Sequence, residues 1–250
     1  MADNISIIKL NEVDSTNRYA RDEASTLWRE AGTGKIIAIT AKHQTAGRGQ
    51  LGNIWQSQAG NNLLLTLLVR PGQSLKVTEQ FKLSQTVAVA LHSTMKRYGI
   101  DTRLKWPNDI YVGNRKLAGI LIELDYSGNF VEQAIIGVGL NVNQVQFPTM
   151  DRIPVSMKML KNNDFDIEDI LCNVLKDFEM YYNDLSDEHH TIANEYSSLL
   201  LGHCKENRFA DADGAFTAII EGVDSYGRII LRTDDGSIRK YTFKEVEMLL

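Results

Sequence analysis

The 250-residue sequence is poor in the features that mark secreted and membrane proteins. It has two cysteines, Cys172 and Cys204, and no Cys-x-x-Cys pair, so we expect reduced thiols and a cytoplasmic protein. Its longest apolar run, Leu63 to Val69, is interrupted by Thr66 and is far too short to span a bilayer. The N-terminus has no basic segment followed by an apolar one, so we predict no signal peptide and no membrane partner.

An excess of positive charge is also missing. The net charge is -5, which argues against a mainly electrostatic nucleic-acid binder. The residues before Asp14 are too few for a winged helix or a helix-turn-helix, so we expect no DNA binding. The remaining composition, 43% hydrophobic and 24% charged, is typical of globular proteins, and the length suits a large domain with or without a small one.

The stretch that carries most of the expected chemistry is a glycine-rich loop, Thr40 to Gln56, which follows the apolar run Ile36 to Ile39. Three glycines surround Arg48 within it. Glycines allow a backbone to approach a ligand closely, and arginine offers a planar, permanent charge to a carboxylate or phosphate. We therefore predict a binding loop for a small anionic ligand, with an ordinary flexible surface loop as the alternative.

The segment Gly47 to Gly52 also fits G-x-G-x-x-G, the fingerprint of dinucleotide-binding folds. That motif needs a helix directly after it and an acidic residue about 20 residues further on. Asn53 to Ser57 has no helical periodicity, and the first acidic residue downstream is Glu79. The sequence therefore argues against a dinucleotide-binding fold.

Hydrophobic periodicity predicts an α+β protein with a mixed, largely antiparallel sheet flanked by helices. From Gly202 onward, short strands separated by turns predict a small β-barrel, so we expect two domains, residues 1–200 and 201–250. The expected helices cover residues 14–32, 77–98, 166–184 and 188–200. The expected strands of the large domain cover residues 5–10, 36–39, 63–69, 102–105, 110–112, 116–124 and 133–138.

Five ordered motifs give the sequence a specific family resemblance. They are Ser-Thr-Asn (15–17), Gln-x-x-Gly-Arg-Gly (44–49), Lys-Trp-Pro-Asn-Asp (105–109), Lys-Leu-Ala-Gly-Ile-Leu-Ile-Glu (116–123) and Gly-Val-Gly-Leu-Asn-Val-Asn (137–143). Together they resemble the biotin protein ligases, which attach biotin to carboxylase carrier proteins. The resemblance implies the class II synthetase-like catalytic fold of that family, followed by an SH3-like barrel. Without the N-terminal winged helix of bifunctional members, the chain resembles the monofunctional ligases.

The resemblance implies a two-step reaction. ATP activates the carboxylate of biotin as biotinyl-5'-AMP and releases pyrophosphate, and a lysine of the biotin carboxyl carrier protein then attacks the mixed anhydride. Both steps gather negative charge on phosphoryl oxygens, so they need positioning and electrostatic stabilisation and no protein nucleophile. The sequence offers no convincing Ser-His-Asp or Cys-His set. Mg²⁺ is expected to accompany ATP, and no metal site made of protein ligands alone is expected.

The resemblance also implies roles for individual residues, with Lys116, Arg48 and Asp109 as the catalytic ones. Lys116 would bridge the biotin carboxylate and the α-phosphate. Asp109 would either order the metal and phosphates or deprotonate the acceptor lysine, and the second role is favoured. The residues expected to bind biotin are Ser15, Thr16, Asn17, Gln44, Arg48, Gly49, Gln50, Lys116 and Gly119. Those expected to bind ATP or the adenylate are Arg48, Gly49, Gln50, Trp55, Asn108, Lys116, Gly139 and Asn141.

Gln50 departs from the family pattern Gly-Arg-Gly-Arg, in which the fourth residue is arginine. Glutamine forms hydrogen bonds but brings no charge, which predicts weaker retention of the adenylate. One alternative function is a lipoate or octanoate ligase or transferase of related fold, whose arginine-glycine-rich and histidine-containing segments are not seen. Another is a non-catalytic biotin-binding module, in which Lys116 and Asp109 would have no clear use. A homodimer is compatible with the sequence.

Overall fold

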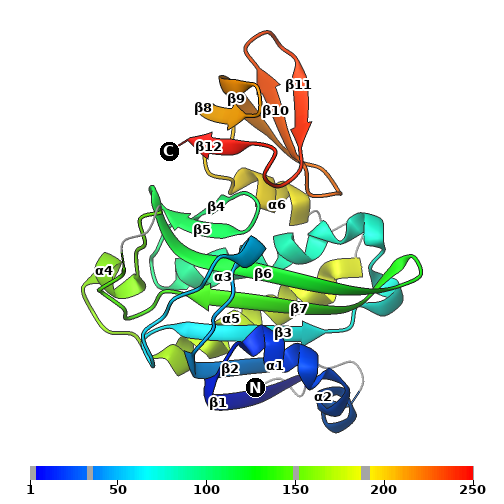
Figure 1. Ribbon diagram of the computed structural model, residues 1–250, viewed down its shortest axis with the longest axis vertical. Coiled ribbons are helices and arrows are strands. Elements are labelled where there is room, and N and C mark those ends of the chain that lie inside the picture. Colours follow the sequence, from blue (N-terminus) through cyan, green and yellow to red (C-terminus); the bar gives the residue numbers. More distant parts are fainter. Residues whose placement is uncertain (1–3, 33–35, 149–151, 187–191, 250) are drawn as a thin grey trace.

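The computed structural model describes residues 4–32, 36–148, 152–186 and 192–249. These residues form a large α+β unit and a small all-β unit, which lies above it in Figure 1. The sheet of the large unit ends at Leu140, and that of the small unit begins at Glu206. The predicted division at residue 200 lies between the two sheets, directly after the last helix.

The large unit is built on a seven-stranded sheet with the order β1-β2-β3-β7-β6-β5-β4. Its strands are β1 (Ile5–Val13), β2 (Ile36–Gln44), β3 (Leu63–Val69), β4 (Arg103–Lys105), β5 (Asp109–Val112), β6 (Arg115–Ser127) and β7 (Phe130–Leu140). β1 and β2 run parallel, and the other neighbouring strands run antiparallel. The predicted mixed, largely antiparallel sheet is confirmed.

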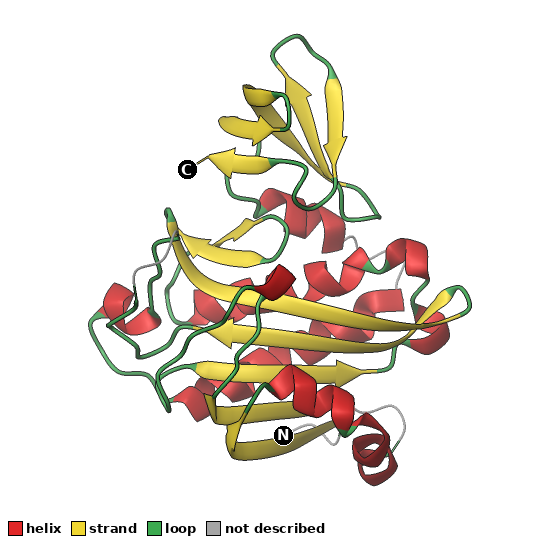
Figure 2. Cartoon of the chain, in the orientation of Figure 1, coloured by secondary structure: helices red, strands yellow, loops and turns green. Residues whose placement is uncertain are grey.

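Helices cover both faces of this sheet, as Figure 2 shows. α3 (Phe81–Arg97) and α5 (Ile167–Asn183) contribute their apolar sides to the main core, together with β3, β6 and β7. α1 (Thr16–Asp22) and α2 (Ala24–Ala31) cover the opposite face with a smaller core. Because successive strand residues point to opposite faces, the sheet supplies both cores. The smaller core consists of Ala20, Leu27, Trp28, Ile37, Ile39, Leu68 and Ile135.

Several predicted helix boundaries are wrong. Residues 14–32 form two helices and not one, because Glu23, with φ -97° and ψ 3°, leaves the helical conformation between α1 and α2. The helix predicted over 77–98 starts with the 3₁₀ turn η3 (Val77–Glu79) before α3. The helix predicted over 188–200 lies partly outside the described residues, and α6 covers Ile192–Ser198. The remaining helical elements are η1 (Gln50–Gly52), η2 (Gly72–Ser74), α4 (Met157–Lys161) and η4 (Asp184–Ser186).

The small unit is a five-stranded antiparallel sheet with the order β11-β10-β9-β8-β12. Its strands are β8 (Glu206–Asp211), β9 (Gly214–Val223), β10 (Ile229–Thr233), β11 (Ile238–Tyr241) and β12 (Glu247–Leu249). In the described part of the chain no ladder joins β11 to β12, so the predicted small C-terminal β unit is confirmed as an antiparallel sheet that is open between these two strands. Both edge strands are short, four and three residues, which leaves few ladder positions for closure.

Trp106 connects the two units beside the β4–β5 turn. Its indole Nε1 donates a 2.9 Å hydrogen bond to the carbonyl of Gly227, and its ring meets Phe243 edge to face with centroids 6.3 Å apart. The backbone of Leu104 in β4 also bonds to Leu199 and Leu201, which precede the small unit. These contacts hold the C-terminal sheet against the β5 side of the large sheet. None of the described helices is long and apolar enough to cross a membrane.

Candidate functional site

A cavity of about 740 Å³ lies between the start of α1, the glycine-rich loop, strands β5 to β7 and the end of the small unit. Its volume is in the range of small-molecule sites. The structure brings together all fourteen residues that the sequence analysis assigned to a ligand. They are Ser15, Thr16, Asn17, Gln44, Arg48, Gly49, Gln50, Trp55, Asn108, Asp109, Lys116, Gly119, Gly139 and Asn141.

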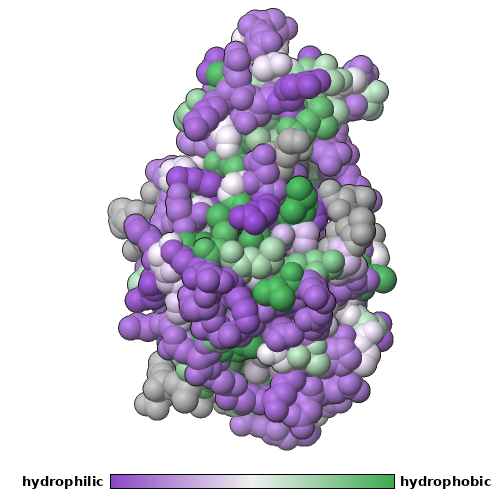
Figure 3. Space-filling model, turned by 90° about the vertical axis from the view of Figure 1, so that its left-hand side faces the viewer, coloured by the Kyte–Doolittle hydropathy of each residue, from purple (hydrophilic) through white to green (hydrophobic). Residues whose placement is uncertain are grey.

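Apolar side chains are exposed around this region. Figure 3 shows them gathered in the middle of one face, between the polar surface of the small unit above and the polar surface below. Four of the large exposed apolar residues line the cavity, namely Ile54, Ile153, Phe243 and Leu249. They come from three separate segments, so the rim of the cavity belongs to both units.

One part of the cavity wall, which we call the neutral end, consists of Ser15, Thr16, Asn17, Gln44 and the underlying Thr66. Gln44 Oε1 accepts a hydrogen bond from the backbone N–H of Thr16 at 2.7 Å and lies 3.0 Å from the Thr16 hydroxyl. The Thr66 hydroxyl lies 2.8 Å from Thr16 Oγ1 and 2.7 Å from Asn17 Oδ1. Ser15 occupies the N-cap position of α1, but its hydroxyl makes no capping hydrogen bond. The neutral end therefore joins α1 to β2 and β3 through side-chain hydrogen bonds.

A glycine in β7 makes room for the neutral end. A Cβ atom built on Gly137 would lie 2.4 Å from Asn17 Oδ1, a distance that real Cβ atoms do not show. Asn17 Nδ2 donates to Glu123 Oε2 at 3.0 Å and approaches the carbonyl of Leu121 at 3.4 Å. The absence of a side chain at Gly137 thus allows the Asn17 amide to lie directly on the sheet.

A second part of the wall, which we call the charged end, consists of Arg48, Asp109, Lys116 and Arg152, with Glu123 beside Arg48 outside the lining. Lys116 Nζ lies 2.7 Å from Asp109 Oδ1, and Arg152 NH1 lies 2.7 Å from Asp109 Oδ2. The Asp109 side chain is 3% exposed, so a buried carboxylate holds both cations. Arg48 NH1 lies 3.2 Å from Glu123 Oε1, whose side chain is 18% exposed. Each of the three cations is therefore paired with a carboxylate of the chain.

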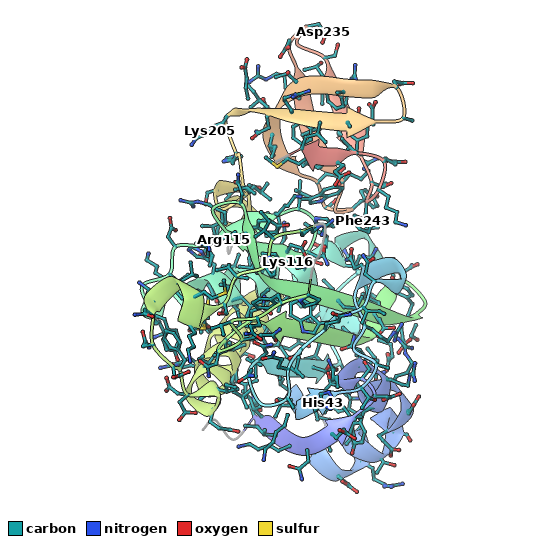
Figure 4. All side chains as sticks on the ribbon, turned by 60° about the vertical axis from the view of Figure 1, so that its left-hand side comes forward. His43, Arg115, Lys116, Lys205, Asp235 and Phe243 are labelled. Atoms are coloured by element: carbon teal, nitrogen blue, oxygen red, sulfur yellow. The ribbon has the colours of Figure 1, made fainter. Side chains whose placement is uncertain are left out.

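Strand pairing explains how Asp109 and Lys116 meet. They lie on the adjacent antiparallel strands β5 and β6, whose register is irregular between Ile110 and Tyr111. Both side chains reach the same cavity from the two arms of this hairpin. Figure 4 shows Lys116 near the middle of the molecule, with Phe243 of the small unit above it. Lys116 and Phe243 both line the cavity, so side chains of both units face it.

Trp55 packs against two glycines of the large sheet. Gly119 and Gly139 face each other across β6 and β7, and a Cβ atom on Gly139 would lie 2.3 Å from the indole. Lys116 Nζ lies over the Trp55 ring, 5.7 Å from its centroid. Trp55 Nε1 and Gln50 Oε1 are buried and have no hydrogen-bond partner within the described ranges. Such buried polar atoms are uncommon, and these two line a cavity where a ligand could satisfy them.

Two predicted site residues also support the backbone. Asn108 Nδ2 donates to the carbonyl of Ile120 at 2.7 Å, and Asn141 Nδ2 donates to that of Val155 at 3.1 Å. Both side chains therefore fix the strands and loop from which Lys116 emerges. This structural task was not part of the prediction for either residue.

The structure adds residues that the sequence analysis missed. Glu123 ended one of the quoted motifs but received no role, and Thr66 was noted only as an interruption of an apolar run. A polar residue in such a run signals an internal hydrogen bond, so Thr66 could have been found. Arg152 lies in a loop without periodicity and gave no signal. Lys105 and Tyr111 also line the cavity, and burial lowers the pKa of Lys105 and raises that of Tyr111 to about 12.

Among the described residues, the carboxylates that line the cavity are Asp109 and Glu247. Within the described residues, no group of three or more His, Cys, Asp or Glu side chains could hold a metal ion. Mg²⁺ keeps several waters and binds through one or two carboxylates together with substrate phosphates. The cavity therefore fits an ion that arrives with a nucleotide, for which Asp109 or Glu247 could supply one ligand.

The sequence matches two known families along most of its length. Residues 11–141 match the biotin/lipoate A/B protein ligase family, and residues 208–249 match the biotin protein ligase C terminal domain. The bifunctional ligase/repressor BirA of Bacillus spizizenii is 32% identical over 246 residues, which span 97% of this chain and 74% of that protein. The biotin–[acetyl-CoA-carboxylase] ligase of Paracoccus denitrificans is 36% identical over 136 residues, 53% of each chain.

A solved structure shares the complete fold. The biotin protein ligase from Aquifex aeolicus, in complex with biotin and ATP, has a TM-score of 0.78 and 25% sequence identity to this chain. The similarity covers 98% of both chains, so it includes the large and the small unit.

Proposed function

The chain belongs to the biotin/lipoate A/B protein ligase family, and from this premise we propose that it is a biotin protein ligase. It uses ATP to convert biotin into biotinyl-5'-AMP and pyrophosphate. It then transfers the biotinyl group to a lysine of a biotin carboxyl carrier protein and releases AMP. The relatives named as biotin ligases and the solved complex with biotin and ATP support both substrates.

The observation that carries the proposal is the presence of a neutral end and a charged end in one cavity. Biotin has the same division, with an uncharged ureido ring at one end of the molecule and a carboxylate at the end of an aliphatic tail. Leu65, Leu121 and Val138 also line the cavity and offer apolar surface for the rings and the tail. The ureido ring would lie at Thr16 and Gln44, and the carboxylate would lie near Arg48 and Lys116.

Adenylation requires two anions to approach each other. A carboxylate oxygen of biotin attacks the α-phosphorus of ATP, a P–O bond forms, and pyrophosphate leaves with its electron pair. Lys116 and Arg48 supply positive charge where the attacking and phosphoryl oxygens meet. Mg²⁺, which we propose as the companion of ATP, would neutralise the leaving phosphates. We propose that Trp55 and Gln50, whose buried Nε1 and Oε1 atoms have no hydrogen-bond partner among the described residues, bind the adenylate.

Transfer to the carrier requires a neutral acceptor lysine, whose ordinary pKa is about 10.4. We propose that Asp109 accepts the proton. In the ligand-free structure both of its oxygens are paired, with Lys116 and Arg152. When Lys116 moves onto the adenylate, Asp109 Oδ1 becomes available to the incoming amine, which attacks the acyl carbon while AMP leaves. The alternative role, ordering the metal and phosphates, would make Asp109 essential already in the first step.

The cytoplasm is the compartment that we propose for this reaction. Cys172 and Cys204 are both free and exposed, as expected in a reducing environment.

Exchange of labelled pyrophosphate into ATP tests the proposal. We expect exchange that depends on biotin and is not supported by lipoate or octanoate. Biotin binding without exchange would identify a non-catalytic biotin-binding module, and exchange with lipoate or octanoate would identify a lipoate-type ligase. Preformed biotinyl-AMP added to a carrier domain then tests the second step by itself.

A further inference from the structure

Thr66 lies beneath the cavity wall, where no ligand can touch it. It is 0% exposed and occupies the centre of β3, where the other six residues are leucine or valine. A hydroxyl group buried among apolar side chains is costly unless it forms hydrogen bonds. Its partners are two residues of the neutral end, Thr16 Oγ1 at 2.8 Å and Asn17 Oδ1 at 2.7 Å.

The sheet register places this hydroxyl under both partners. Thr66 lies directly opposite Gly137 in the β3–β7 ladder, and the missing side chain of Gly137 admits the Asn17 amide. The hydroxyl therefore reaches the first turn of α1 from below. Thr66 and Gly137 thus form the part of the sheet surface against which Thr16 and Asn17 pack.

The number of available protons and the lengths of the contacts together favour one direction for these hydrogen bonds. Each threonine hydroxyl has one proton, and an amide oxygen can only accept. Gln44 Oε1 already receives the backbone N–H of Thr16 at 2.7 Å, whereas Asn17 Oδ1 has Thr66 as its hydroxyl donor. Placing the two hydroxyl protons on the two shortest contacts, 2.7 Å to Asn17 Oδ1 and 2.8 Å between the hydroxyls, directs the Thr16 hydroxyl to Thr66 and the Thr66 hydroxyl to Asn17, in preference to the 3.0 Å contact between the Thr16 hydroxyl and Gln44 Oε1.

This direction determines what the neutral end offers to a ligand. With its proton directed toward Thr66, Thr16 Oγ1 presents lone pairs to the cavity. Gln44 Oε1 is committed to Thr16, so Gln44 presents Nε2, which has no hydrogen-bond partner in the described part of the chain. The cavity thus holds an acceptor beside a donor. A cyclic urea, with ring N–H groups beside a carbonyl, is complementary to this pair.

We propose that Thr66 is a positioning residue that sets the hydrogen-bond polarity of the neutral end and thereby selects a cyclic urea. This inference rests on the proposed biotin ligase function. Thr66 acts through Thr16, Asn17 and Gln44 and does not touch the reacting atoms. Its loss should therefore weaken binding of the ureido ring and leave the chemistry of the charged end unchanged.

The test is Thr66→Val, which keeps the shape of the side chain and removes the hydroxyl. In biotin-dependent pyrophosphate exchange we expect the KM for biotin to rise roughly 10- to 100-fold, with kcat and the KM for ATP within about twofold. Desthiobiotin, which keeps the ureido ring, should lose affinity by the same factor. Thr66→Ser restores the hydroxyl and should restore the KM for biotin.

Thr86→Val is the matched control, because Thr86 is also 0% exposed and its hydroxyl has no hydrogen-bond partner among the residues described. Thermal melts check folding, and Thr66→Ala takes the place of the valine variant if that variant is unfolded. An unchanged KM for biotin in a folded variant, or an equal rise in the KM for ATP, would overturn the inference. If the wild-type protein shows no exchange, the proposed function fails, and direct binding of biotin and desthiobiotin to the same variants still tests Thr66.

Discussion

At the neutral end of the cavity, Thr16 bonds to both Gln44 and Thr66. At the charged end, by contrast, Lys116 and Arg48 are paired with carboxylates of the chain. A ligand can add its hydrogen bonds to the first set without breaking it. At the second set, the ligand's anionic groups must replace Asp109 and Glu123. Substitutions should therefore affect binding and chemistry separately, because the hydrogen bonds of the neutral end are already formed, whereas the cations of the charged end must exchange their carboxylate partners for the ligand.

Lys116→Ala should have the largest effect of the substitutions at the charged end. The substitution removes one of the two cations that lie 2.7 Å from the buried Asp109 and leaves the neutral end intact. We expect the rate of adenylation to fall about 100- to 1000-fold, since a positioned charge in a water-poor site contributes on that scale. Biotin-dependent pyrophosphate exchange measures the loss.

Arg115→Ala is the control for this prediction. Arg115 precedes Lys116 in β6 and is labelled beside it in Figure 4, but it does not line the cavity. We expect near-normal exchange from this variant. Normal adenylation by Lys116→Ala would remove the central role given to this lysine.

Asp109→Asn should separate the two half-reactions. If Asp109 takes the proton of the acceptor lysine, pyrophosphate exchange persists while transfer from preformed biotinyl-AMP slows about 100-fold. The variant also leaves Lys116 and Arg152 without their shared counter-charge, so a lower melting temperature is expected. Single-turnover transfer to a carrier domain provides the measurement.

Asp101→Asn provides the comparison, because Asp101 is exposed and pairs with Arg103 away from the cavity. We expect this variant to carry out both steps normally. Lost exchange together with normal transfer in Asp109→Asn would assign Asp109 to the metal and phosphates instead.

Both ends were predicted only in part from the sequence. The polar triplet 15–17, Gln44, Arg48 and Lys116 were found because each belongs to a short motif, and the structure places them in one cavity. Thr66 and Glu123 were given no role because their function depends on strand register, which sets which residues face each other across β3, β6 and β7. Arg152 comes from a loop, where neither periodicity nor motif applies.

Arg48→Ala should have a smaller effect than the loss of Lys116. The Arg48 side chain is 42% exposed. Its removal also leaves Glu123 without one of its cationic partners. We expect affinity for biotinyl-AMP to fall roughly 10- to 30-fold, the scale of one charge-assisted hydrogen bond with part of its strength lost to solvent. Equilibrium dialysis with labelled ligand measures the change.

Arg21→Ala is the matched control for this measurement. Arg21 also lies near Glu123, at 3.5 Å, but it does not line the cavity. Its loss should change affinity less than twofold. Equal effects from the two substitutions would mean that Arg48 acts by holding Glu123 and not by binding the ligand.

Gln50→Arg should have the smallest effect, by adding a cation near the charged end. Gln50 lines the cavity, and its buried Oε1 has no partner within the described residues. An arginine at this position brings a charge that no carboxylate of the described site already neutralises, so its gain on binding a phosphate is not offset by a lost internal pair. We expect biotinyl-AMP to dissociate about 5- to 10-fold more slowly.

Stopped-flow displacement by excess biotin measures the rate, and Gln50→Leu, which adds no charge, should not slow it. A dissociation rate that is unchanged or faster in Gln50→Arg would show that this position does not hold the intermediate, and that retention depends on Arg48, Lys116 and Trp55 alone.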